Sequence, residues 1–177
     1  MISEKGLIRA MKNAWKGAGY TVSVRERLIY IEGKEWDAVM HVDMLPRKAL
    51  ALLVEHIGSI LKDGEAYTCT KGGGAQTVSP MVVFDRMNEL IQLELHESAK
   101  KTKLSWGDAE IWQSCADWRI LGIDPEYAEI VGEKSRGDAY IRDNYVIWQE
   151  GAKVRVAAVR LPEAVQFLSS VQWTGEG

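Results

Sequence analysis

The chain has 177 residues, of which 46% are hydrophobic and 27% are charged, and its formal net charge is −3. A chain of this length can form one ordinary domain with a complete core, or two small lobes that share a core. The longest unbroken hydrophobic run, residues 49–54, is far shorter than the roughly 20 residues that cross a bilayer, which excludes a membrane-spanning segment.

Cysteine usage and the first residues predict the compartment. Cys69 falls in a predicted strand and Cys115 in a predicted helix, a placement typical of small buried hydrophobic residues rather than of a disulfide framework. Residues 1–6 lack the continuous apolar segment of a secretion signal. We therefore expect a cytoplasmic protein that needs no disulfide, metal or cofactor.

Charge is distributed unevenly along the chain. Residues 1–27 contain six basic and two acidic residues, a sum of +4, whereas residues 104–138 contain eight acidic and three basic residues, a sum of −5. A chain polarised in this way either pairs its own charges across the fold or presents one face to a charged partner.

The first half of the chain predicts helices alternating with strands. Hydrophobic residues at helical spacing predict a helix over residues 3–16, which ends at the glycines of residues 17–19. A three-stranded meander follows, and Pro46 is suited to the first turn of the next helix. Beyond the first helix, the predicted elements are strands 20–24, 28–32 and 36–42, a helix 46–62, strands 65–70 and 75–79, and a helix 80–95.

The second half predicts more helix. Residues 98–105, rich in lysine, are typical of an exposed linker, and Ser105 has capping spacing for a helix that carries Ile111, Trp112, Cys115 and Trp118. After it come a short helix 125–131, a hairpin of strands 145–149 and 153–159, and a last helix that begins at Leu161-Pro162.

These elements predict an α+β protein in which antiparallel hairpins or a meander are each followed by a packed helix, with a helix at the N-terminus. We expect an αβββαββα lobe over residues 1–98 and an ααββα lobe over residues 105–177, packed as one compact unit. Residues 28–53 and 145–168 share the order strand, glycine turn, strand, Leu-Pro, helix. This similarity has two interpretations, internal duplication or local rules common to hairpin-helix units, and the sequence leaves open whether the hairpins join in one sheet.

Two groups of residues are candidates for binding. Lys5, Arg9, Lys12 and Lys16 recur at steps of four, three and four, so they lie on one stripe of the first helix. The stripe is either a solvated face or a face for a phosphate-bearing or acidic partner, including nucleic acid.

Seven tryptophans are more than a domain of this size needs. We assign four of them, Trp15, Trp36, Trp112 and Trp148, to the core. The other three, Trp106, Trp118 and Trp173, form a second candidate patch, because exposed aromatic residues are preferred anchors at protein interfaces. The alternative is that these three also cover apolar edges of the fold.

An enzymatic alternative comes from the order helix, three strands, helix, strand over residues 3–70. This order resembles the core of restriction-endonuclease-like nucleases, which hold Mg²⁺ through an Asp and a Glu-x-Lys. Glu32-Gly33-Lys34 has that spelling and Asp37 follows, but the family carries the triplet within the third strand, whereas here it spans a turn. Catalytic residues are therefore not assigned beyond this alternative, and no residues form a metal-ligating motif.

Residues 11–22 (MKNAWKGAGYTV), 45–60 (LPRKALALLVEHIGSI) and 71–78 (KGGGAQTV) resemble a family of small uncharacterised accessory proteins of bacterial prophages and conjugative elements. The resemblance implies a role in a mobile element, and such proteins, anti-CRISPR inhibitors among them, often act by binding a protein of the host or of the element. We therefore expect a non-enzymatic binding protein with a protein or nucleoprotein partner. A Mg²⁺-dependent nuclease with a degenerate core and a structural module that dimerises are the alternatives.

Overall fold

The computed structural model describes residues 2–132, 139–151 and 154–161. In this part of the chain the fold is α+β with a helix at the N-terminus, as predicted, and its strands form one antiparallel sheet, a point that the sequence left open. None of the described helices is long and apolar enough to cross a membrane. The elements are α1 (Glu4–Lys16), β1 (Tyr20–Arg25), β2 (Leu28–Glu32), β3 (Trp36–His41), a 3-10 turn (Val42–Met44), α2 (Arg47–Ile57), β4 (Ala66–Thr70), β5 (Gly74–Thr77), α3 (Pro80–Gln92), β6 (Ser98–Trp106), β7 (Ala109–Ser114), β8 (Ile120–Ile123), α4 (Pro125–Ala128), β9 (Ala139–Arg142), β10 (Tyr145–Glu150) and β11 (Val154–Val159).

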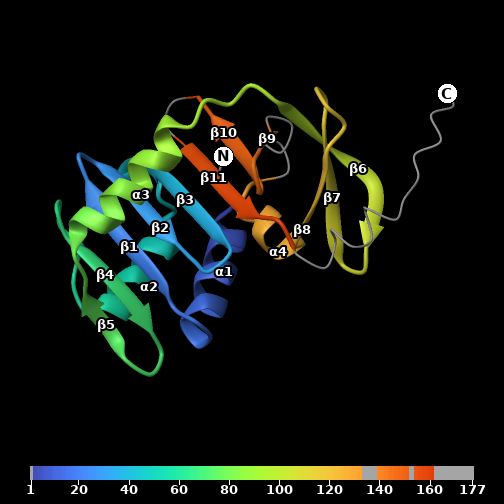
Figure 1. The fold of residues 1–177 in the computed structure, drawn as a ribbon. Helices are drawn as coiled ribbons and strands as arrows, with labels where there is room; N and C mark the ends of the chain where they lie inside the picture. Colours follow the sequence, from blue (N-terminus) through green and yellow to red (C-terminus); the bar gives the residue numbers. More distant parts are fainter. Residues whose placement is uncertain (1, 133–138, 152–153, 162–177) are drawn as a thin grey trace, which may run out of the picture.

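All the strands belong to a single sheet in the order β5-β4-β1-β2-β3-β11-β10-β9-β6-β7-β8, and every neighbouring pair is antiparallel (Figure 1). The middle of the sheet is the pairing of β3 with β11, where Trp36 lies opposite Ala158 and Met40 opposite Val154. The two predicted lobes therefore contribute strands to one continuous sheet.

Helices cover both faces of this sheet. Figure 1 shows α3 in front of the central strands and α1 and α2 behind them. Neighbouring residues of a strand point to opposite faces, so Ile31 packs into the core under α1 and α2 while Tyr30 packs under α3. The larger core contains Leu7 of α1, and the smaller core contains Phe84 of α3.

Helix starts follow local rules. The Ser3 hydroxyl caps α1 by accepting a hydrogen bond from the Gly6 N–H at 3.2 Å, and the Asp124 carboxylate caps α4 through the Glu126 N–H at 2.8 Å. Pro46 immediately precedes α2, and Pro80 and Pro125 open α3 and α4. Proline fits at these positions because the first N–H groups of a helix have no acceptor within the helix, so a residue without an N–H loses no hydrogen bond.

The position of α1 depends on a close backbone contact. The Ser3 N–H donates to the Ile130 carbonyl at 2.8 Å, and Ile2 forms an isolated β-bridge with Val131. A Cβ atom added at Gly6 would overlap with the Glu129 carbonyl. Only glycine at residue 6 therefore lets α1 rest directly on the backbone that follows α4.

The C-terminal strands curl toward one another. Trp112 of β7 and Trp148 of β10 meet edge to face with ring centroids 5.3 Å apart, although two strands separate β7 from β10 in the sheet order. The Leu161 N–H also donates to the Gly122 carbonyl of β8 at 2.8 Å. β7 and β10, which are not neighbours in the sheet, thus come into contact, and both tryptophans belong to the larger core.

Two predictions for the second half are wrong. Residues 98–105, predicted as a linker, form most of β6, and residues 105–121, predicted as a helix, form the β6–β7 turn, β7, the β7–β8 loop and the start of β8. Ile111 and Trp112 are adjacent in β7 and both fully buried, although neighbouring residues of a strand point to opposite faces. Ile111, Trp112, Cys115 and Trp118 are separated by one, three and three residues, which is the spacing of one helix face. The sequence pattern therefore predicted a helix here.

Of the predicted repeat of residues 28–53 in residues 145–168, the structure describes only the strands, and β2–β3 and β10–β11 are both antiparallel hairpins. The order hairpin then helix also occurs in β4, β5 and α3, but α3 packs on the opposite face of the sheet from α2. The predicted last helix lies outside the described residues, and strand β9 was not predicted.

Substituting Gly6 by alanine tests the position of α1. In an exposed helix, glycine to alanine stabilises by about 1 kcal/mol. Because the added methyl would overlap with Glu129, we expect Gly6→Ala to lower the free energy of unfolding by about 2 kcal/mol, in the range of overpacked cores.

Denaturant unfolding measures this difference. Gly72→Ala is the matched control, since a Cβ there meets no atom within 4 Å, and we expect it to be neutral. An increase in stability for Gly6→Ala would contradict the position of α1.

Candidate functional site

The predicted basic stripe on α1 is exposed but not uniformly available. Arg9 Nη1 lies 2.5 Å from Glu129 Oε2, and the Asn13 side chain donates to both carboxylate oxygens of Glu126 at 2.9 Å. Lys5, Lys12 and Lys16 are exposed, and within the described ranges none of them forms an ion pair. The stripe is thus reduced to three free lysines, with Arg9 held by the segment after α4.

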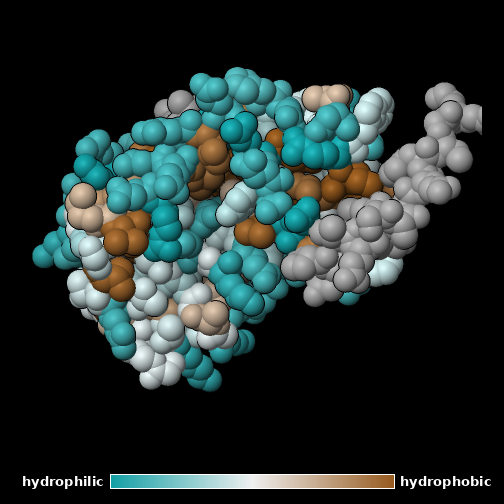
Figure 2. All heavy atoms as spheres, viewed as in Figure 1, coloured by the Kyte–Doolittle hydropathy of each residue, from teal (hydrophilic) through white to brown (hydrophobic). Residues whose placement is uncertain are grey.

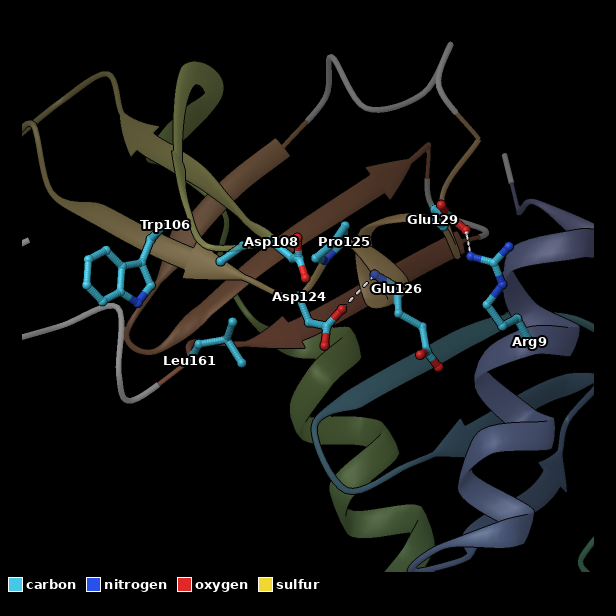
Figure 3. A pocket seen from close by; sticks show the side chains of 9 residues that line it. Arg9, Trp106, Asp108, Asp124, Pro125, Glu126, Glu129 and Leu161 are labelled. Carbon is cyan, nitrogen blue, oxygen red and sulfur yellow. Dashed lines mark hydrogen bonds and ion pairs between the residues drawn. The ribbon is translucent and has the colours of Figure 1, made fainter. Parts of the chain in front are cut away.

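A cavity of about 580 Å³ lies between α1, α4 and the β6–β7 turn (Figure 3). Arg9 lies at one end and Trp106 at the other, so the cavity brings together one residue from each predicted binding patch. Its lining also includes four carboxylates, those of Asp108, Asp124, Glu126 and Glu129. This surface is therefore acidic, although the sequence predicted a basic one at Arg9.

Trp118 is the most exposed large hydrophobic residue of the described chain, at 72%. It lies in the loop 114–119 between β7 and β8, which we call the tryptophan loop, and its φ of +63° is in the left-handed region. A bulky residue rarely adopts this conformation, because its Cβ crowds the following carbonyl. The fold holds a large apolar ring in water on a strained backbone.

Hydrogen bonds fix the tryptophan loop. The Ser114 hydroxyl accepts from the N–H groups of Ala116 and Asp117 at 3.1 and 3.3 Å, and Asp117 accepts from the Arg119 N–H at 3.1 Å. The Arg119 guanidinium also pairs with Asp117 and with Glu97. The loop is consequently organised before any partner binds, which lowers the entropy lost on association.

The three tryptophans of the predicted second patch are not one patch. Trp106 pairs with Ala109 at the start of β7, whereas Trp118 follows the other end of that strand, so the length of β7, about 17 Å, separates the two ends. Trp106 is 40% exposed, and Trp173 lies outside the described residues. Of the four tryptophans assigned to the core, three are buried. Trp15 is half-buried and stacks on the His56 ring, with the two ring centroids 3.9 Å apart.

The nuclease alternative named Glu32, Lys34 and Asp37, and the structure brings two of these together. Glu32 and Asp37 lie opposite each other on β2 and β3. Lys34 is in the turn between them, its side chain is 74% exposed, and it lies 3.6 Å from Glu35. No group of three metal-ligating side chains is present in residues 2–132, 139–151 and 154–161.

The carboxylate pair has specific partners beneath α3. The Tyr30 hydroxyl donates to Asp37 Oδ1 at 3.0 Å, and Arg86 Nη1 of α3 lies 2.6 Å from Glu32 Oε1. Burial raises the pKa of Asp37 to about 7, partly offset by the Tyr30 hydrogen bond. Burial also raises the pKa of Glu32, and the Arg86 charge opposes that shift.

Tyr30 and Arg86 were not identified from the sequence. Tyr30 was recognisable only as a strand residue, and Arg86 is 54 residues from its partner Glu32. Their role depends on α3 crossing β2 and β3, a long-range contact that no local motif signals.

The resemblance to accessory proteins of mobile elements was drawn from three segments. They form the end of α1 with the start of β1, helix α2 with its flanks, and the β4–β5 turn with β5, all parts of the scaffold. Of the candidate binding residues, only Lys12 and Lys16 fall within them. Comparison with known protein families and with curated proteins finds no match for the chain.

Replacing Asp37 by asparagine tests the raised pKa. The folded state binds the Asp37 proton up to about pH 7, whereas the unfolded state releases it near pH 3.8, so this residue makes stability fall as pH rises between those values. Asp37→Asn removes that dependence and keeps an acceptor for Tyr30. We expect the variant to gain about 2 kcal/mol on wild type between pH 5 and pH 8.

Urea unfolding at both pH values gives this difference, and taking variant minus wild type cancels other titrating groups such as His56. Asp85→Asn, at an exposed position of α3, is the matched control for replacing a carboxylate by an amide. A constant difference for Asp37→Asn at the two pH values would contradict a buried, protonated Asp37.

Proposed function

We propose that this protein is a non-enzymatic binding protein that acts on a protein or nucleoprotein partner, in the setting of a bacterial mobile element. The observation that carries the proposal is Trp118, 72% exposed at the tip of a loop that hydrogen bonds hold in place. Tryptophan is among the residues that contribute most to binding at protein interfaces. An exposed tryptophan lowers solubility, and the left-handed backbone that holds it is strained. Binding of a partner would offset both unfavourable effects.

The free lysines of α1 support the same proposal. Lys5, Lys12 and Lys16 form an exposed row of three positive charges along one helix. Such a row attracts an acidic or phosphate-bearing surface and raises the association rate at low salt. The lysines therefore act in steering, while Trp118 contributes most of the affinity.

The nuclease alternative has weaker support. Lys34, which would have to hold the attacking water, is exposed and next to Glu35, away from the Glu32–Asp37 pair under α3. A dimerising structural module is the other alternative, and an anchor such as Trp118 would serve it equally well.

Replacing Trp118 tests the proposal directly. The immobilised protein and its Trp118→Ala variant are used to recover partners from a bacterial lysate, and the recovered partner is then titrated against each. We expect the substitution to weaken binding about 30-fold, which corresponds to a loss of 2 kcal/mol typical of an interface anchor. Stability should change by less than about 0.5 kcal/mol because the ring is exposed.

Trp106→Ala is the matched control, since Trp106 is exposed at the other end of β7. Equal binding by wild type and Trp118→Ala would contradict the role of the loop.

Two experiments test the alternatives. Light scattering at two concentrations identifies a second copy of the chain as the partner. Plasmid cleavage with Mg²⁺ that Glu32→Ala abolishes would favour the nuclease.

Charge reversal of the lysine row tests steering. We expect Lys5→Glu combined with Lys12→Glu and Lys16→Glu to lower the association rate about tenfold at low salt, with little change in the dissociation rate. Surface plasmon resonance at two salt concentrations measures both rates. An unchanged association rate would exclude the row from recognition.

A further inference from the structure

A second cavity, of about 260 Å³, lies on the other side of the molecule from α1, between the sheet and α3. Its floor is the Glu32–Asp37 pair with Tyr30, and its wall is α3, which contributes Arg86, Leu90 and Leu93. The end of β9 and the start of β10 complete its mouth. Neither Trp118 nor the lysine row lines it, so its function can be tested independently of partner binding.

The wall of this cavity is held in place. The Arg155 side chain of β11 donates to the carbonyls of Leu90 and Leu93 at 2.7 and 2.9 Å, at the C-terminal end of α3. These carbonyls are among those a helix end leaves without an intrahelical donor, so one arginine fixes the helix to the sheet. The cavity therefore exists in the absence of a ligand.

The floor of the cavity has fewer hydrogen-bond donors than its carboxylate oxygens can accept from. Glu32 Oε1 accepts from Arg86, but Glu32 Oε2 is fully buried and accepts no hydrogen bond from any described residue. A buried acceptor without a donor costs about 1–3 kcal/mol, and more when it is charged. Asp37 adds further acceptor oxygens, since the one described donor to its carboxyl group is the Tyr30 hydroxyl.

We propose that this cavity binds a small organic cation whose ammonium or guanidinium group lies between Glu32 and Asp37. Such a group supplies several N–H donors, including one for the buried Glu32 oxygen, and its charge compensates two adjacent carboxylates. Leu90 and Leu93 offer an apolar wall for its aliphatic part. The volume is slightly below that of ordinary small-molecule pockets, so the ligand is a compact amine or guanidine.

Binding of a cation is coupled to release of a proton. A positive charge next to Asp37 favours its ionised form and so lowers its pKa from about 7. The charged and titratable groups that line the cavity with Asp37 are Tyr30 and Glu32 on β2, Arg86 and Glu89 on α3, and Arg142, Asp143 and Tyr145 at the mouth. On the neighbouring strand β11, Arg155 is occupied by the carbonyls of Leu90 and Leu93. Arg86 pairs with Glu32 Oε1 and Arg142 lies beside Asp143, and neither of them donates to Glu32 Oε2.

Isothermal titration with agmatine and with butylamine, and with succinate as the anionic control, tests the proposal. At pH 6.5, in two buffers that differ in ionisation enthalpy, we expect an amine to bind with release of a fraction of a proton, and succinate not to bind. Glu32→Gln should weaken binding at least tenfold. Asp37→Asn should abolish the buffer dependence, while the matched control Asp43→Asn should behave as wild type.

Two results would overturn the proposal. The first is absence of binding heat and of a shift in Tm with either amine at 10 mM. The second is binding that Glu32→Gln and Asp37→Asn leave unchanged, since an amine bound elsewhere would not respond to these residues. Circular dichroism establishes that each variant is folded, and Asp37→Asn keeps the test decisive if Glu32→Gln is not.

Discussion

The pairing of β3 with β11 is the constraint on which the rest of the structure depends. It joins residues more than 100 positions apart and makes one sheet from what would otherwise be two separate sets of strands. Both strands are buried on both faces, from Ala38, Val39 and Met40 in β3 to the Val156–Ala158 segment of β11. Small side chains at Ala38, Ala157 and Ala158 let helices approach the sheet closely from either side.

The carboxylate cavity is a consequence of that junction. Asp37 lies between Glu32 on β2 and Ala157 on β11, so β11 completes the sheet beside it and removes one of its open sides. α3 then crosses the same face and is fixed by Arg155, also from β11. Burial of two acids is unfavourable by itself, and a fold retains such a feature where it has a use. The tryptophan loop, by contrast, is held by local hydrogen bonds around Ser114 and Asp117 and by contacts with the segment that begins β6, from Arg119 to Glu97 and from the Cys115 N–H to the Ser98 carbonyl.

The sequence was informative where structure is local. Pro46, Pro80 and Pro125 identified helix starts, and glycine turns identified the β2–β3 and β10–β11 hairpins, because these residues restrict the backbone directly. It was misleading in residues 98–121. There β6 exposes its lysines like a linker, and β7 buries the adjacent residues Ile111 and Trp112, so the alternation of buried and exposed residues that identifies a strand is missing. The sheet order and the neighbours of Asp37 come from contacts between distant residues, which no spacing within one segment reveals.

Native-state hydrogen exchange of β3 and β11 tests the central role of their pairing most directly. If this pairing holds the two halves of the sheet together, amides on both strands exchange only through global unfolding, with one common free energy that matches denaturant unfolding. Exchange in β11, β10 and β9 at a distinctly lower free energy than in β3 would show that the C-terminal half opens by itself. That result would contradict a single cooperative sheet and, with it, a preformed cavity under α3.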